Sequence, residues 1–115
     1  MEYPYPSDEE LIEYERRLKV RLIELEALSE SSREARSAVS LDQSRVGRLS
    51  RMDAMQMQEM ERANEARRAF ERQRVERALS LIERGDYGEC VNCGEVIAPK
   101  RLRLDPSYLT CVGCA

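Results

Sequence analysis

Apolar side chains recur every three or four positions from Leu11 to Leu28, whereas charged residues fill most of the positions between them. This spacing places the apolar groups on one face of a helix, as in a helix that packs against a partner. Just before it, Ser7 and Glu10 form a capping-box pair, so we expect the helix to begin there. The predicted stripe consists of Leu11, Tyr14, Leu18, Leu22, Leu25 and Leu28.

A second helical pattern runs from about Leu49 to Arg84, and Gly85 stands where a helix commonly ends in glycine. Roughly 35 residues at about 1.5 Å each would make a helix on the order of 50 Å long. We expect its stripe residues, methionines included, to be core rather than a ligand-binding surface. The predicted stripe consists of Leu49, Met52, Met55, Met60, Ala63, Ala66, Phe70, Ala78 and Ile82.

The stretch LDQSRVGRL at 41–49 separates the two patterns. Residues 1–42 hold 11 acids and 6 bases, a net charge of −5, whereas residues 43–84 hold 7 acids and 10 bases, a net charge of +3. Opposite charge and similar length favour an antiparallel helical hairpin over residues 1–85 with its tip near 40–49, whereas a coiled-coil homodimer is the alternative. Two starts of the second helix stay open, one capped by Asp42 and one at Ser50.

Composition narrows the class of protein. The chain has 115 residues, of which 36% are charged and 5% aromatic. This composition predicts one small, elongated domain with a thin core. The formal net charge of −3 does not suit a protein that binds nucleic acid through bulk charge. No stretch has the apolar length of a signal peptide core or a membrane span, so a cytoplasmic protein without membrane contact is expected.

Four cysteines supply the candidate chemistry. Cys90 and Cys93 form one C-x-x-C pair and Cys111 and Cys114 a second, with 17 residues between the pairs. This spacing is typical of a closed four-thiolate zinc site, which predicts one structural Zn²⁺ in a small module over residues 86–115. Redox catalysis and two structural disulfides are the alternatives. Because the sequence has no histidine, a catalytic zinc with imidazole ligands is excluded.

The module is too short to form much core alone, so metal binding is expected to supply most of its folding free energy. Tyr87 is predicted to pack at the junction with the hairpin, and Gly94 and Gly113 to ease the two cysteine turns. The expected apolar packing set is Ile97, Leu102, Leu104 and Leu109, and the bases that could offset the charge of the thiolates are Lys100, Arg101 and Arg103.

These features together resemble a known family. After the second helical pattern come YGEC, C-x-x-C-G and a final C-x-x-C, with Ile97, Arg101, Leu102 and Pro106 between them. A long hairpin followed by this module is similar to the DksA/TraR family of bacterial transcription regulators, also called DnaK-suppressor proteins, over residues 8–115. The zinc module is the specific part of the resemblance.

The resemblance implies a regulator that binds RNA polymerase and performs no covalent chemistry, so no enzyme activity is expected. In that family the zinc module anchors a hairpin that enters the secondary channel, and acidic residues at the hairpin tip act near the active site. The best-known members work jointly with the alarmone ppGpp. The helix that follows the zinc module in longer members is expected to be missing after Ala115.

The tip residues are the expected partner contacts. The family tip pattern Asp-x-x-Asp-x-Ala falls on Asp42, Arg45 and Gly47, of which Asp42 alone matches. Arginines here could contact carboxylates or phosphates instead, because guanidinium groups suit both, or could simply solvate an exposed turn. The predicted partner-binding residues of the tip are Asp42, Ser44, Arg45 and Arg48.

Two other function classes stay open at this point. A DNA-binding zinc finger has little electrostatic support, because the zinc segment has three basic residues against four acids. A zinc-containing adaptor could instead use its helical face to recruit an unrelated protein. The expectation is a monomer that binds RNA polymerase without direct sequence-specific contacts to DNA.

Overall fold

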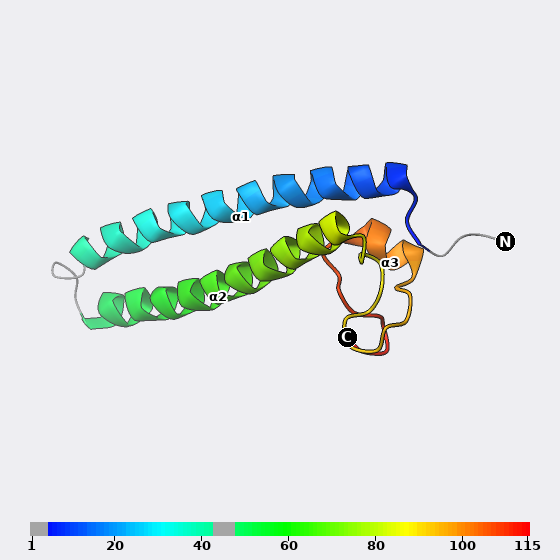
Figure 1. Cartoon of the computed structure of the whole chain (residues 1–115). Coiled ribbons are helices and arrows are strands. Elements are labelled where there is room, and N and C mark those ends of the chain that lie inside the picture. Colours follow the sequence, from blue (N-terminus) through cyan, green and yellow to red (C-terminus); the bar gives the residue numbers. More distant parts are fainter. Residues whose placement is uncertain (1–4, 43–47) are drawn as a thin grey trace. The chain divides into compact units, whose positions relative to one another are not determined.

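The chain is described here by a computed structural model that covers residues 5–42 and 48–115, with the side chains of 34–50 left out. Three helices are present in these ranges: α1 (Asp8–Asp42), α2 (Arg48–Arg84) and the short α3 (Pro99–Leu104). An isolated antiparallel bridge joins Glu89 and Val96, and no strand forms in the described part of the chain. Figure 1 shows the two long helices and the irregular segment around α3.

The start of α1 confirms the predicted capping box. The backbone N–H of Glu10 donates to Ser7 Oγ at 3.2 Å, and the backbone N–H of Ser7 donates to Glu10 Oε1 at 3.2 Å. Two N–H groups that a helix start leaves without intrahelical partners are thereby satisfied. Asp8, Glu9 and Glu10 also put negative charge at the positive end of the helix dipole.

The end of α2, like the start of α1, is determined by neighbouring residues. Gly85 has φ +80°, its N–H donates to the carbonyl of Ile82, and the N–H of Asp86 donates to the carbonyl of Leu81 at 2.9 Å. This pair of bonds closes the helix in a Schellman motif, in which glycine adopts the left-handed conformation without steric cost. The predicted stop at Gly85 is confirmed. At its other end α2 begins at Arg48, whereas Asp42 is the last residue of α1.

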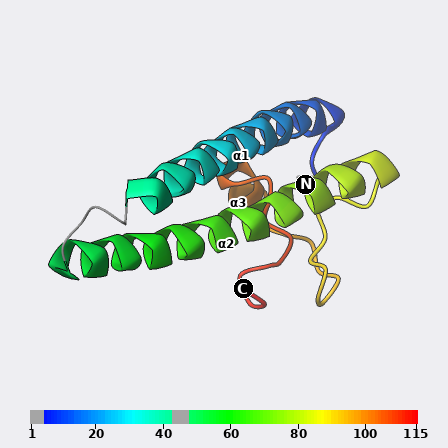
Figure 2. The ribbon, with the colours of Figure 1, turned by 90° about the vertical axis from the view of Figure 1, so that its left-hand side faces the viewer.

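Two compact units divide the chain: unit 1 comprises Met1–Ile23 and Glu71–Ala115, and unit 2 comprises Glu24–Phe70. In each unit the α1 segment lies beside the α2 segment and runs in the opposite direction (Figures 1 and 2). The antiparallel helical hairpin with a C-terminal four-cysteine module, which the sequence predicted, is therefore confirmed within one chain. Among the described residues, no helix combines the length and the apolar character that crossing a membrane requires.

Among the side chains that the structure describes, most of the buried apolar ones belong to unit 1. Tyr14 and Leu18 of α1 are 4% and 2% exposed, and Val75 and Ala78 of α2 are fully buried. These groups recur at three- and four-residue steps, so each helix turns one stripe toward the other. The buried apolar residues of unit 1 are Tyr14, Leu18, Val75, Ala78, Leu81, Tyr87, Cys90, Ile97 and Leu102.

Unit 2 is built differently, because polar side chains lie between its helices. Ser32 of α1 donates to Glu61 of α2 at 2.5 Å. Arg68, whose side chain is 17% exposed, pairs with Glu65 at 3.0 Å and approaches Glu61 at 3.7 Å. Leu25 is the one apolar side chain below a tenth exposed among the described side chains of this unit.

The predicted stripe of α2 is wrong over unit 2. Met55 is 62% exposed and Phe70 is 65% exposed, and Leu28 at the end of the predicted α1 stripe is 48% exposed. On the other face of α2, Gln58, Glu61, Glu65 and Arg68 are half-buried instead. Long side chains of this kind can cover apolar surface with their methylene groups. The exposed large apolar residues of α2 are Met52, Met55, Met57, Met60 and Phe70, all in unit 2.

The apolar packing set predicted for the zinc module is confirmed in part. Ile97 and Leu102 are each 1% exposed, as predicted, and Leu109 is half-buried. Leu104 is 75% exposed and takes no part in the core. The reason is the helical register of α3, which buries Leu102 and therefore turns the position two residues later away from the core.

Candidate metal centre

The first cysteine turn is held by backbone hydrogen bonds on both sides. The N–H of Cys90 donates to the carbonyl of Glu95 at 2.7 Å, and the N–H of Ile97 donates to the carbonyl of Gly88 at 2.9 Å. Between them the N–H of Gly94 closes the turn on the carbonyl of Cys90 at 2.9 Å. Gly94 has φ +78°, so the glycine predicted to ease this turn is required there.

The second cysteine turn follows a stretch that leads back from α3. The Asp105 carboxylate accepts hydrogen bonds from the N–H and the Oγ of Ser107, at 2.9 and 2.8 Å, which forms an Asx turn. The N–H of Cys114 then donates to the carbonyl of Cys111 at 3.0 Å. The N–H of Val91 donates to the carbonyl of Leu109 at 2.9 Å and ties the two turns together.

The sulfur atoms of the four cysteines form one cluster. All four Sγ atoms lie within 4.8 Å of one another, and Cys93 and Cys111 are separated by 3.7 Å between sulfurs. A tetrahedron of thiolates around zinc, with Zn–S bonds of about 2.3 Å, has edges of about 3.8 Å. A cluster of all four sulfurs fits one zinc ion, whereas two disulfides would need sulfur pairs about 2.05 Å apart.

The electrostatics of the cluster also favour a cation. Backbone N–H groups of Cys111 and Cys93 stabilise the thiolate and lower the pKa of Cys90 to about 6. Hydrogen bonds to the neighbouring sulfurs of Cys111, Cys90 and Cys93 favour the protonated thiol and raise the pKa of Cys114 to about 12. All four groups can be deprotonated together near neutral pH when a divalent ion compensates the charge.

The chemistry of such a centre is structural. Four thiolates complete the coordination of zinc and leave no position for water or substrate. Cys90 is 3% exposed and sits at the inner side of the cluster, whereas Cys93 is exposed. The donor set therefore supports one structural zinc, as the sequence predicted, and zinc when bound would hold the two cysteine turns in one fold.

Tyr87 joins the module to the helices of unit 1. Its hydroxyl donates to the carbonyl of Pro106 at 2.7 Å, and its ring lies 6.1 Å from that of Tyr14. Burial raises the pKa of Tyr87 well above its usual value, so the hydroxyl remains a donor. The predicted place of Tyr87 at this junction is confirmed.

The N-terminal residues contact the first cysteine turn, which the sequence did not indicate. Tyr5 donates from its hydroxyl to Glu89 at 2.9 Å. Gly88 has φ +109°, and a Cβ at this position would lie 3.2 Å from Cδ of Pro6. Glycine is therefore required both by the backbone conformation and by the close approach of Pro6. Local sequence patterns do not predict contacts between residues more than 80 positions apart.

The predicted tip residues fall at the edge of the described part of the chain. Asp42 ends α1 and Arg48 begins α2, but the side chains of both lie outside the described residues. Ser44, Arg45 and Gly47 lie outside them altogether. The role predicted for the tip in partner binding therefore stays a prediction.

Comparisons with known proteins agree with this geometry. Residues 85–115 match the family described as the prokaryotic dksA/traR C4-type zinc finger. The chain also resembles the solved structure of transcription factor DksA2 from Pseudomonas aeruginosa, with a TM-score of 0.78 and 22% identity over 99% of this chain and 86% of that chain. None of the curated proteins matches the sequence. The DksA/TraR resemblance drawn from the sequence is thereby confirmed.

Proposed function

We propose that this chain, whose C-terminal module is a DksA/TraR-type zinc finger, is a transcription regulator that binds RNA polymerase. The observation that carries the proposal is the agreement of its fold with a transcription factor over 99% of the chain, combined with the match of the zinc module. The hairpin is proposed to enter the secondary channel, so that the tip around 40–49 comes near the active site. Such a partner would place the action of the protein in the cytoplasm.

The division of labour follows from the chemistry of the two parts. The module of residues 86–115 is proposed to anchor the hairpin of residues 1–85, since a closed four-thiolate zinc offers no open coordination site for catalysis. A regulator of this kind is not an enzyme; it changes the stability of polymerase complexes through contacts. We propose Asp42, Ser44, Arg45 and Arg48 as the contacts at the tip, in a monomeric protein.

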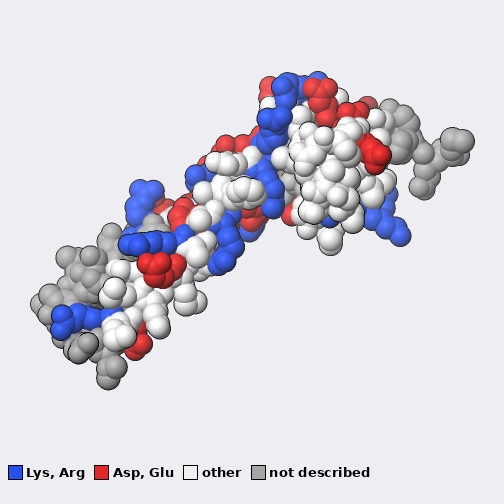
Figure 3. Space-filling model, turned by 90° about the horizontal axis from the view of Figure 1, so that it is seen from below, with Lys and Arg blue, Asp and Glu red and all other residues white. Residues whose placement is uncertain are grey.

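A DNA-binding role has little support from the charges of the module. Arg103 pairs with Glu10 at 3.8 Å, and Arg101 donates to the carbonyl of Thr110. Lys100 is the remaining base of α3, and one lysine provides little attraction for phosphates. Seen from below, the lobe of the zinc module presents mainly uncharged residues (Figure 3). Protein contacts therefore suit this surface better than a nucleic-acid backbone does.

The proposal is tested by binding and transcription with purified core RNA polymerase. The full chain is expected to bind core enzyme at micromolar concentration and to change the lifetime of promoter complexes, with and without ppGpp. Asp42→Ala and Arg45→Ala should keep the binding and the thermal stability but alter the effect on transcription. Glu83→Ala, which removes one exposed charge at the opposite end of α2, is the matched control and should behave as the wild type.

Two results would contradict the proposal in different ways. Absence of binding to core polymerase at micromolar concentration would remove the proposed partner. Binding with normal transcription by the Asp42→Ala and Arg45→Ala variants would reduce the tip to a connection between helices. The arms with and without ppGpp decide whether the alarmone acts jointly with this protein.

A further inference from the structure

The two cysteine turns are supported unequally by the backbone. The first turn has bonds from Cys90 to Glu95, from Gly94 to Cys90 and from Ile97 to Gly88, together with the bridge of Glu89 and Val96. Residues 110–115 have the single internal bond from Cys114 to Cys111 and no other backbone bond within the fully described stretch 85–115. Apart from the bond of the Val91 N–H to the carbonyl of Leu109, the second turn therefore has fewer backbone bonds than the first.

Arg101 of α3 supports the second turn through its side chain. Its Nε donates to the backbone carbonyl of Thr110 at 2.9 Å, and Thr110 immediately precedes the ligand Cys111. The guanidinium carbon also lies 4.2 Å from the centroid of the Tyr108 ring, in a cation–π contact. The planar guanidinium is thus fixed by the ring on its face and by the carbonyl at its edge, an arrangement that suits arginine better than lysine.

The helix that presents Arg101 is itself anchored to α1. Arg17 donates from Nη1 to the carbonyl of Arg103 at 3.0 Å and from Nη2 to the carbonyl of Leu104 at 3.4 Å. These carbonyls belong to the C-terminal turn of α3, where the helix leaves acceptors without intrahelical donors and where positive charge is favourable. The buried side chain of Leu102 fixes the rotation of α3. Arg101 therefore projects from a rigid element.

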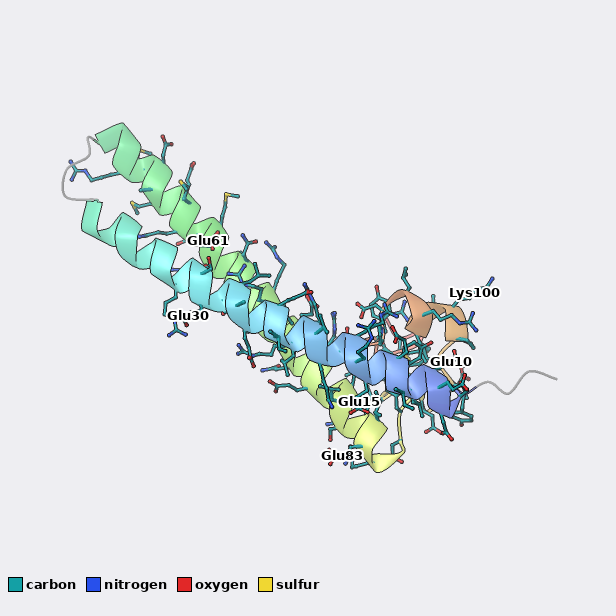
Figure 4. The ribbon with its side chains drawn as sticks, turned by 90° about the horizontal axis from the view of Figure 1, so that it is seen from above. Glu10, Glu15, Glu30, Glu61, Glu83 and Lys100 are labelled. Carbon is teal, nitrogen blue, oxygen red and sulfur yellow. The ribbon has the colours of Figure 1, made fainter. Side chains whose placement is uncertain are left out.

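The neighbouring bases of α3 provide a comparison. Arg103 pairs with Glu10, which lies at the α3 end of α1 (Figure 4). Lys100 is exposed and extends away from the module in the same view. A four-thiolate zinc centre has a net charge of −2, so all three bases could contribute a long-range attraction. Arg101 differs from the others because it holds the backbone next to a metal ligand.

We propose that Arg101 is a positioning residue for the zinc centre. By holding the carbonyl of Thr110, it fixes the peptide that leads into Cys111 and so keeps the sulfurs of Cys111 and Cys114 directed at the metal. Groups that orient metal ligands in this way change metal affinity by roughly 10- to 100-fold when removed. The proposed effect concerns retention of zinc and is independent of the proposed role in transcription.

The experiment compares three variants of the full zinc-loaded chain: Arg101→Gln, Arg101→Lys and Lys100→Gln. Transfer of zinc to a chromogenic chelator is followed over time, and the Co²⁺-substituted proteins are compared by their thiolate charge-transfer and d–d absorption. Arg101→Gln should release zinc roughly tenfold faster than the wild type and alter the cobalt spectrum. Lys100→Gln removes an equal charge from the same helix and should change the rate by no more than about twofold, as expected of a screened surface charge.

Arg101→Lys separates position from charge, because it retains the positive charge but loses the planar group that stacks on Tyr108. It should release zinc at a rate closer to that of Arg101→Gln than to that of the wild type. Wild-type release by Arg101→Lys, together with faster release by both glutamine variants, would show that charge alone matters and overturn the proposal. Equal rates for Arg101→Gln and Lys100→Gln would overturn it as well. Far-UV circular dichroism of the zinc-loaded proteins verifies the helices, and the lysine variant keeps the test decisive if Arg101→Gln fails to fold.

Discussion

Unit 1 and unit 2 use segments of the same two helices but hold them together by different means. Unit 1 buries Leu18, Val75 and Ala78 and adds a zinc centre, whereas unit 2 joins its helices through the hydrogen bond of Ser32 to Glu61 and leaves its methionines exposed. Apolar burial stabilises by about 25 cal/mol per Å², whereas a hydrogen bond contributes a net 0.5–1.5 kcal/mol, about 1 on average. Stability is therefore expected to concentrate in unit 1.

The contrast suits the proposed division of labour. A well-packed unit with a metal centre provides an anchor of fixed shape. A unit with few apolar contacts between its helices opens locally at lower free-energy cost. On its outer face Met52, Met55, Met60 and Phe70 are 54–66% exposed.

Removal of the metal should have the largest effect on the difference in stability between unit 1 and unit 2. Chelation, or Cys93→Ser, is expected to unfold the C-terminal module, because zinc binding contributes on the order of 10 kcal/mol in small zinc domains. Much of the helicity should remain, since the start of α1 and the end of α2 are capped and Leu18, Val75 and Ala78 are buried without help from the metal ligands. Near-UV circular dichroism and NMR spectra would follow the module, and far-UV signals the helices. Unchanged near-UV and NMR spectra after complete removal of zinc would contradict the prediction.

A matched pair of truncations measures the difference in packing directly. Leu18→Ala in unit 1 should lower the free energy of unfolding by about 2–5 kcal/mol, as expected for a buried leucine. Met55→Ala in unit 2, where the side chain is 62% exposed, should change it by no more than about 0.5 kcal/mol. Urea denaturation of both zinc-loaded variants gives the comparison. Equal losses would mean that Met55 is covered in solution.

A smaller effect than that of Leu18→Ala is expected for the ion pair of Arg21 and Glu71 in unit 1. Arg21 donates to Glu71 at 2.6 and 2.9 Å, and this contact holds the pKa of Glu71 below its ordinary value of 4.5. Because the folded pKa is the lower one, the stabilisation is complete above the unfolded pKa and is lost as the pH falls through the folded pKa. Glu71 also senses the charges of Arg74 and Asp105, which face it from α2 and from the stretch after α3.

Glu71→Gln is the variant that measures this effect. It should lower stability at pH 7 by about 1 kcal/mol or less, since both partners remain partly exposed to solvent. At a pH below both pKa values, the variant and the wild type should have the same stability. Urea titrations across this range test the sign, and a constant difference at every pH would assign the effect of Glu71 to packing rather than to its charge.

Local sequence patterns determined the parts of this protein that depend on neighbouring residues. Ser7 with Glu10 starts α1, Gly85 ends α2, and the two C-x-x-C pairs specify a zinc module, because each of these features is closed by bonds within a few positions. The antiparallel hairpin also followed from charge and length. Residues of the tip, from Asp42 to Arg48, were identified by resemblance and stay predictions.

Tertiary structure decided which face of each element turns inward and which distant residues meet. Along α2 the three- and four-residue spacing of Met52, Met55 and Phe70 defined a face but not its direction, and the face with Glu61 and Arg68 packs instead. The sequence likewise did not predict the contacts of Tyr5 with Glu89 and of Arg101 with Thr110. Helical periodicity specifies which side chains share a side, whereas inward and outward are set by the energy of the whole interface, where long polar side chains compete with apolar ones.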